Sequence, residues 1–178
     1  MLKLVPAEKR QLPWVIRLYK SAFPRQEQKP IWLIKKRRRK GIIEVLLIMD
    51  GEQPAGFAIA APFEERVLLA YFAVAPEGRG KGTGSEALSL IRRRYEGKSL
   101  FLEIEALDER AENAEQRARR KAFYLRNGMR ESGFFSRLAG MKMEVLIAGE
   151  DLDFERYFQV YEGVMGPRIA KKVVQRAE

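Results

Sequence analysis

Residues 74–84 read Val74-Ala75-Pro76-Glu77-Gly78-Arg79-Gly80-Lys81-Gly82-Thr83-Gly84, between an apolar segment and a segment with helical periodicity. The closely spaced glycines let the backbone turn tightly and approach a ligand. Amide groups at the start of the following helix then point outward, and Arg79 and Lys81 add positive charge beside them. The sequence therefore predicts a strand, an anion-binding turn and a helix, in that order.

This Gly-rich turn differs from the two common nucleotide-binding motifs. Lys81 is followed by Gly82 and not by Ser or Thr, which argues against a Walker motif. A Gly-x-Gly-x-x-Gly spacing does not fit a strand-to-helix turn here either. A pyrophosphate remains the obvious ligand, although a sulfate fits equally, and such a turn also occurs where a chain merely reverses direction.

Hydrophobic periodicity predicts the elements on both sides of the turn. Strands are expected at residues 2–5, 42–49, 55–61, 66–74, 99–106, 134–138 and 143–148. Helices are expected at residues 12–23, 31–40, 87–95 and 114–126. Strands and helices that mix without strict alternation predict an α+β (mixed α/β) fold, in which helices lie on the faces of a mixed sheet.

Composition restricts the chemistry. The 178 residues suit one compact domain, and a net charge of +10 favours anionic partners. The chain has no Cys and no His, which excludes disulfides, Cys-based metal sites, Ser-His-Asp triads and imidazole bases. Catalysis must then rely on carboxylates, Tyr, Lys, hydroxyl groups or backbone dipoles, and no metal is expected.

Nothing in the sequence indicates a membrane or an export route. No apolar stretch approaches the ~20 residues of a membrane-spanning helix. The N-terminal residues lack a basic region followed by an apolar block and a small-residue cleavage site. A cytoplasmic location is therefore the expectation, without contact with a membrane.

Two motifs carry a resemblance to a known family. Arg79, Gly82 and Gly84 match the Arg/Gln-x-x-Gly-x-Gly/Ala motif with which the GNAT superfamily of N-acetyltransferases binds acyl-CoA after a strand. The stretch Phe123-Tyr124-Leu125-Arg126-Asn127-Gly128-Met129 resembles the family's Phe-Tyr-x-x-x-Gly-Phe, with Met129 in place of Phe. The element order matches as well, so residues 1–150 are expected to form a GNAT-like domain, a fold with a central, mostly antiparallel sheet flanked by helices. Residues 151–178 should form a helical extension on the same domain.

The resemblance implies acetyl-CoA as acyl donor and assigns its contacts. The strand before the turn would bind the pantetheine arm and polarise the thioester carbonyl, and the turn would hold the pyrophosphate. The implied cofactor-binding residues are Phe72, Ala73, Val74, Arg79, Gly80, Lys81, Gly82, Thr83, Gly84, Ser85 and Phe123.

Catalytic roles also follow from the resemblance. Tyr124 matches the tyrosine that protonates the CoA sulfur, although a buried structural tyrosine is the alternative. Glu103 resembles a glutamate that some members use as base, and strand alternation places Glu105 on the same face. A solvated strand edge explains two such carboxylates equally well. Glu27, between the first two helices, would lie at the acceptor site or on the surface.

The sequence thus predicts an N-acetyltransferase that transfers the acetyl group of acetyl-CoA to a primary amine by direct attack. The rival hypothesis is a non-catalytic CoA-binding or RNA-binding or partner-binding module that uses the cationic run 35–40. No aromatic residue interrupts that run for base stacking, so nucleic acid is the minor alternative. The acceptor, a small molecule or a protein, stays open, and so does a homodimer.

Overall fold

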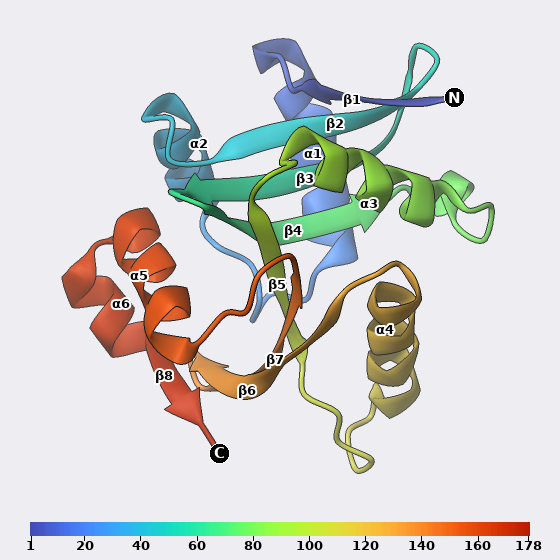
Figure 1. Ribbon diagram of the computed structural model, residues 1–178. Helices are drawn as coiled ribbons and strands as arrows, with labels where there is room; N and C mark the ends of the chain where they lie inside the picture. The colour runs from blue at the N-terminus through green and yellow to red at the C-terminus, as the bar shows by residue number, and fades with distance from the viewer. The chain divides into compact units, whose positions relative to one another are not determined.

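The computed structural model describes residues 1–178 (Figure 1). Its strands are β1 (Leu2–Pro6), β2 (Glu44–Asp50), β3 (Gln53–Phe63), β4 (Arg66–Val74), β5 (Ser99–Glu105), β6 (Arg130–Leu138), β7 (Met141–Ala148) and β8 (Val174–Ala177). Its helices are α1 (Leu12–Ala22), α2 (Ile31–Arg39), α3 (Thr83–Arg94), α4 (Ala114–Arg126), α5 (Phe154–Met165) and α6 (Pro167–Val173), with short 3-10 helices η1 (Lys9–Gln11) and η2 (Pro76–Gly78).

The strands follow the order β1-β2-β3-β4-β5-β7-β6-β8 in the sheet. The pairs β1–β2, β2–β3, β5–β7, β6–β7 and β6–β8 are antiparallel. Strands β4 and β5 run parallel, with Arg66 opposite Ser99 and Leu68 opposite Phe101. The predicted mixed fold with a mostly antiparallel sheet is thereby confirmed.

The chain forms two compact units. The first comprises Met1–Pro62 and Leu69–Glu96, and the second comprises Phe63–Leu68 and Gly97–Glu178. The second unit includes the whole of the C-terminal tail.

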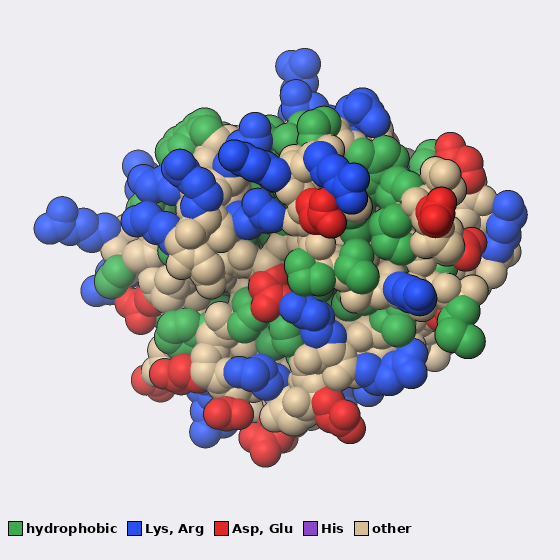
Figure 2. Space-filling model, turned by 90° about the horizontal axis from the view of Figure 1, so that it is seen from above, with side chains coloured by type: hydrophobic (Ala, Val, Ile, Leu, Met, Phe, Trp, Pro, Cys, Tyr) green, Lys and Arg blue, Asp and Glu red, His purple; other side chains and the backbone are tan.

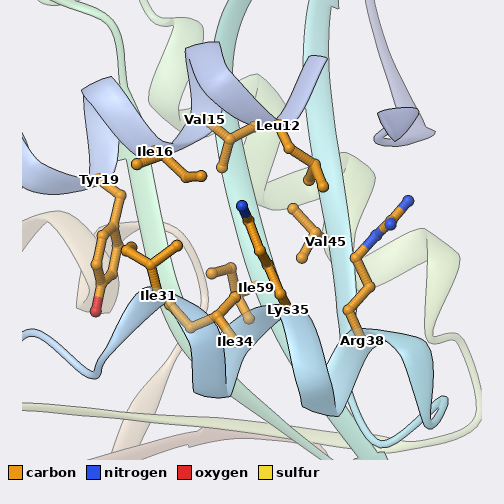
Figure 3. A pocket seen from close by; sticks show the side chains of 10 residues that line it. All are labelled: Leu12, Val15, Ile16, Tyr19, Ile31, Ile34, Lys35, Arg38, Val45 and Ile59. Atoms are coloured by element: carbon orange, nitrogen blue, oxygen red, sulfur yellow. The ribbon is translucent and has the colours of Figure 1, made fainter. Parts of the chain in front are cut away.

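In the first unit, helices cover both faces of strands β1 to β3. Side chains alternate along β2, so that Val45 and Ile48 point to opposite faces. Ile48 clusters with Leu2 of β1 and Ala87 of α3. Val45 lines a narrow apolar hollow beneath α1 and α2 (Figure 3). The amphipathic patterns that predicted these helices are explained by this packing.

In the second unit, helices also pack on both faces of the sheet. Ile104 of β5 lies opposite Glu144 of β7, so these two side chains share a face, and Lys121 of α4 binds Glu144 there. Phe101 and Glu103 both point to the face opposite Ile104. The Phe101 ring lies 5.8 Å from the ring of Tyr157 of α5. Helix α4 therefore covers one face and α5 the other.

The tail after residue 150 is more than a helical extension. Helix α5 begins after the N-cap Asp153, whose side chain accepts a hydrogen bond from the Arg156 amide. It ends at the C-cap Gly166, which has a φ of 86° and precedes Pro167. The chain then forms α6 and returns as β8, which pairs with β6 from Leu138 opposite Val174 to Phe135 opposite Ala177. A strand of four residues is too short for its alternation to be recognised in a sequence.

Cations are prominent on the surface. Figure 2 shows Lys and Arg side chains gathered over one half of the face in view, with fewer Asp and Glu side chains among them. This distribution agrees with the net charge of +10. None of the helices has both the length and the apolar character required to cross a lipid bilayer.

All six tyrosines are buried, and burial raises the pKa of every one of them. Tyrosines of the unfolded chain ionise near pH ~10. Because the folded-state pKa values lie above that value, the stability that these phenols contribute is complete below pH ~10 and is lost as the pH rises further.

We expect tyrosinate absorbance to stay flat through pH ~10 and to rise only together with the loss of circular dichroism at higher pH. A pH titration that records both signals on one sample tests this. Tyrosinate appearing near pH ~10 while the circular dichroism stays native would contradict it.

Candidate active site

The Gly-rich turn forms as the sequence predicts. After η2 the backbone reaches Gly80 with φ of 75° and Gly82 with φ of 80°, a left-handed conformation that favours glycine. Gly82 is the N-cap of α3, and as a glycine it has no side chain that could cap the helix amides. A Cβ atom on Gly80 or Gly82 would meet nothing within 4 Å, so the space above the turn is open.

The start of α3 presents free backbone donors toward that space. The first helical hydrogen bond joins the Glu86 amide to the Gly82 carbonyl at 3.1 Å. The amides of Thr83, Gly84 and Ser85 precede it and have no acceptor within the helix. The helix dipole adds positive potential at the same end. These donors fit the phosphate oxygens of a CoA-type ligand.

Two cations flank the turn. Arg79 Nε donates to the Val74 carbonyl at 3.3 Å, which holds the arginine side chain near the end of β4. Arg79 and Lys81 are both exposed. The turn therefore combines backbone donors with two accessible positive charges, which is the donor set that a pyrophosphate requires.

The predicted pantetheine residues form the end of β4. Phe72 packs at the edge of the cluster beneath α3, and Ala73 is buried. A Cβ atom on Gly56 of β3 would lie 2.6 Å from the Ala73 carbonyl oxygen, so only glycine allows this approach. The Ala75 amide donates to the Ala55 carbonyl at 2.8 Å. The residues predicted to contact pantetheine and pyrophosphate, 72–85, therefore all lie in the first unit.

Tyr124 is the one buried residue of α4. Its side chain is 9% exposed, and burial raises its pKa to about 12, against the opposing charge of Arg120. The Phe123 ring lies 5.1 Å away, and the Tyr124 hydroxyl has no hydrogen-bond partner in the protein. At neutral pH this phenol keeps its proton and is free to donate it.

Glu103 is held by the tail of the chain. Tyr157 donates a hydrogen bond to its Oε1, and Tyr161 donates to its Oε2 at 2.5 Å. Both tyrosines are almost fully buried, at 0% and 1% exposure. Burial first, and then the carboxylate charge, raises the pKa of each phenol. Neither tyrosine was predictable as a partner of Glu103, because in the sequence both belong to an apolar helical pattern that indicates only burial.

Glu105 binds different partners from Glu103. Arg117 Nη2 lies 2.9 Å from its Oε1, and Arg120 Nη1 lies 3.6 Å from its Oε2. Asn113 Nδ2 also donates to Oε2 at 3.1 Å. The alternative of a strand edge with two solvated carboxylates is therefore wrong. One carboxylate binds tyrosines of α5, and the other binds cations of α4.

The loop between α1 and α2 is fixed through its backbone. Tyr71 donates to the Glu27 carbonyl oxygen at 2.7 Å. The Lys29 amide donates to the Tyr19 hydroxyl at 2.6 Å. Buried phenols need such partners, which explains tyrosines on otherwise apolar faces. These hydrogen bonds fix the backbone of Glu27 within this loop, which belongs to the same compact unit as the Gly-rich turn.

The comparisons with known proteins agree with this geometry. The family description "Acetyltransferase (GNAT) domain" matches residues 41–131, just over half of the chain. The matched region contains the Gly-rich turn, β5 and α4 with Tyr124. A search of curated protein sequences gives no match.

Several solved structures share the fold. An acetyltransferase of the GNAT family from Bacteroides thetaiotaomicron is 22% identical with a TM-score of 0.73, covering 96% of this chain and 94% of that one. The ribosomal-protein-S18-alanine N-acetyltransferase of Escherichia coli is 21% identical with a TM-score of 0.59, covering 86% and 100%. An acetyltransferase of Salmonella typhimurium, solved with its cofactor acetyl-CoA, is 16% identical with a TM-score of 0.58, covering 86% and 96%.

Sequence identities of this size show that the fold is shared. The family match, which covers just over half of the chain, shows the family to which this chain belongs. The matched residues include both motifs on which the resemblance was based. The chain belongs to the GNAT family of acetyltransferases, enzymes that take the acetyl group from acetyl-CoA without a metal.

Proposed function

We propose that this protein transfers the acetyl group of acetyl-CoA to a primary amine by direct attack. The observation that carries the proposal is the open start of α3. There the amides of Thr83, Gly84 and Ser85 lack acceptors and lie beside Arg79 and Lys81. Such a site suits the pyrophosphate of CoA, and the family match places it in an acetyltransferase domain.

When bound, acetyl-CoA supplies a thioester carbonyl that an amine can attack. The backbone of Phe72, Ala73 and Val74 is proposed to bind the pantetheine arm, and an amide there to polarise the carbonyl. Phe123 and the turn from Arg79 to Ser85 complete the set of contacts. Most of these roles belong to the backbone, so side-chain substitutions there will report them weakly.

Tyr124 is proposed as the general acid. Its phenol holds a proton at neutral pH because burial raises its pKa to about 12. The hydroxyl has no partner to give up before it donates to the departing sulfur. A positioned proton donor of this kind contributes a factor of roughly a hundred to ten thousand to the rate.

Glu103 is proposed to have one of two roles. As a base it would accept a proton from the attacking amine, which its position on β5 supports. As an anchor it would hold α5 through two phenols. Both carboxylate oxygens of Glu103 accept a hydrogen bond from a buried tyrosine of α5, so the contacts favour the anchor.

Calorimetric titration with acetyl-CoA at moderate salt tests the proposal, with dephospho-CoA and ATP as anion controls. We expect tight binding of acetyl-CoA and weaker binding of both controls. A screen of amine acceptors by thiol release then identifies the substrate class. Equal binding of all three ligands, or none, would reduce the turn to a generic anion site or a structural element.

The two cations of the turn give a sharper test. Arg79→Gln combined with Lys81→Gln should weaken acetyl-CoA binding by roughly tenfold, because two charge-assisted contacts to phosphate are lost. The exposed pair Lys171→Gln and Lys172→Gln on α6 removes the same charge elsewhere and serves as the control. The same loss in both double variants would mean that net charge alone attracts the ligand.

A further inference from the structure

Helix α2 divides its cationic run between two directions. Ile31, Ile34 and Arg38 line the apolar hollow beneath α1 (Figure 3). Arg38 Nη2 donates to the Ala7 carbonyl oxygen at 2.5 Å, and Arg37 is buried. At least two of the six cations therefore serve the fold and are not offered to a partner.

The outer face of α2 is different in character. It carries Trp32, Lys36, Arg39 and Lys40, all exposed and spaced by four, seven and eight residues from the tryptophan. Such spacing places them on one side of a helix. These four residues form the α2 basic face. Trp32 is 64% exposed and is the only aromatic among the exposed large hydrophobic side chains.

The charges of the α2 basic face are not neutralised within the protein. Helix α2 contains no acidic residue. None of Lys36, Arg39 and Lys40 forms an ion pair or a side-chain hydrogen bond, whereas other exposed arginines, such as Arg119, bind a carboxylate. An indole surrounded by three unpaired cations has both an apolar plane and a positive field to offer to a ligand.

We propose that the α2 basic face binds single-stranded nucleic acid. The indole of Trp32 stacks on an unpaired base, and Lys36, Arg39 and Lys40 contact phosphates. This pairing of an aromatic plane with cations is the general chemistry of single-strand binding. The nine residues from Trp32 to Lys40 span ~12 Å along the helix, which accommodates a few nucleotides. In the linear sequence the tryptophan lies outside the run, and only helical geometry joins them.

A membrane surface fits the same face less well. Helices that lie in a bilayer insert a continuous apolar face, while their cations stay at the headgroups. Ile31 and Ile34 of α2 already face the hollow beneath α1, so Trp32 is the one exposed apolar side chain of the helix that could insert. Duplex nucleic acid fits less well too, since its bases are stacked and not open to the indole.

The test measures fluorescence anisotropy of a labelled single-stranded oligouridylate of about 12 nucleotides, with the full chain and a range of salt from about 50 to 200 mM. A duplex RNA of equal length and vesicles of phosphatidylserine and phosphatidylcholine are the comparison ligands. The variants are Trp32→Ala and the pair Lys36→Gln with Arg39→Gln. The α6 pair and the pair in the Gly-rich turn are matched controls.

We expect the single strand to bind more tightly than the duplex. Three phosphate contacts predict a slope of log K against log salt of about −2, and loss of two contacts should reduce its magnitude by about 1.4. Trp32→Ala should weaken binding roughly tenfold without changing the slope. Both control pairs should stay within about twofold of the parent, because neither carries a proposed contact.

Three results would overturn the proposal. An equal loss in the α6 pair would assign binding to net charge, and a loss in the turn pair would place the oligonucleotide on the Gly-rich turn. Binding of vesicles through Trp32 without binding of the single strand would assign the face to lipid. Circular dichroism of each variant verifies that these surface changes leave the fold intact.

Discussion

Tyr124→Phe is expected to lower kcat by roughly a hundred- to ten-thousandfold while the affinity for acetyl-CoA stays unchanged. The substitution removes only the hydroxyl, which has no partner in the protein, and keeps the ring beside Phe123. Thermal stability should therefore change little. Steady-state kinetics with an accepted amine, calorimetry with acetyl-CoA and a melting curve measure the three quantities.

The pH dependence gives an independent check of the same role. A donor with a pKa of about 12 stays protonated as the amine loses its proton, so kcat/KM should rise with pH and not fall from loss of this acid below pH ~11. Tyr95→Phe is the control, since it removes a buried phenol that donates to Glu44 at 2.7 Å. If Tyr124→Phe kept the parental kcat, Tyr124 would be a structural residue.

Glu103→Leu is expected to destabilise the protein by about 3 to 5 kcal/mol, because it removes the carboxylate that accepts a hydrogen bond from each of the buried hydroxyls of Tyr157 and Tyr161. For a chain of this size that loss corresponds to a decrease in the melting temperature of roughly 10 °C. Differential scanning calorimetry and denaturant titration measure it.

Removal of both phenols should rescue the variant. Replacing every partner of a buried hydrogen bond by apolar groups is much less costly than removing one partner. Glu103→Leu with Tyr157→Phe and Tyr161→Phe is therefore expected to recover most of the lost stability. A triple variant that is no more stable than Glu103→Leu would show that the two hydrogen bonds do not anchor α5.

Glu103→Gln separates the anchor from the base. Measured well below its melting temperature, the variant should retain kcat within a few-fold of the parent if Glu103 only anchors the tail. A loss of roughly a hundredfold or more, together with a changed pH profile, would assign the proton of the amine to Glu103. The two roles predict different kinetics from the same purified sample.

The elements that carry strong local signals were predictable from the sequence. The backbone has a positive φ at Gly80 and Gly82, a conformation that favours glycine, so these glycines mark the turn before α3 in the sequence. Helix α4 was expected at residues 114–126 and has those bounds, because the segment consists mostly of strong helix formers and contains no Gly or Pro. The acid candidate Tyr124 followed from a motif on that helix. Strand β8 escaped prediction because four residues show no usable period.

The partners of the charged residues were decided by tertiary structure. Alternation along β5 placed Glu103 and Glu105 on one face, but contacts distant in sequence gave the first to two tyrosines and the second to two arginines. In the sequence the six cations of residues 35–40 are indistinguishable. In the folded chain Arg37 is buried and Arg38 binds the Ala7 carbonyl, whereas the α2 basic face keeps its cations exposed beside Trp32. Local sequence thus determined the backbone path and the family, because turns and periodicity are local. Only the folded chain determined which charges are neutralised and which stay available to a partner, because those distances depend on residues far apart in the sequence.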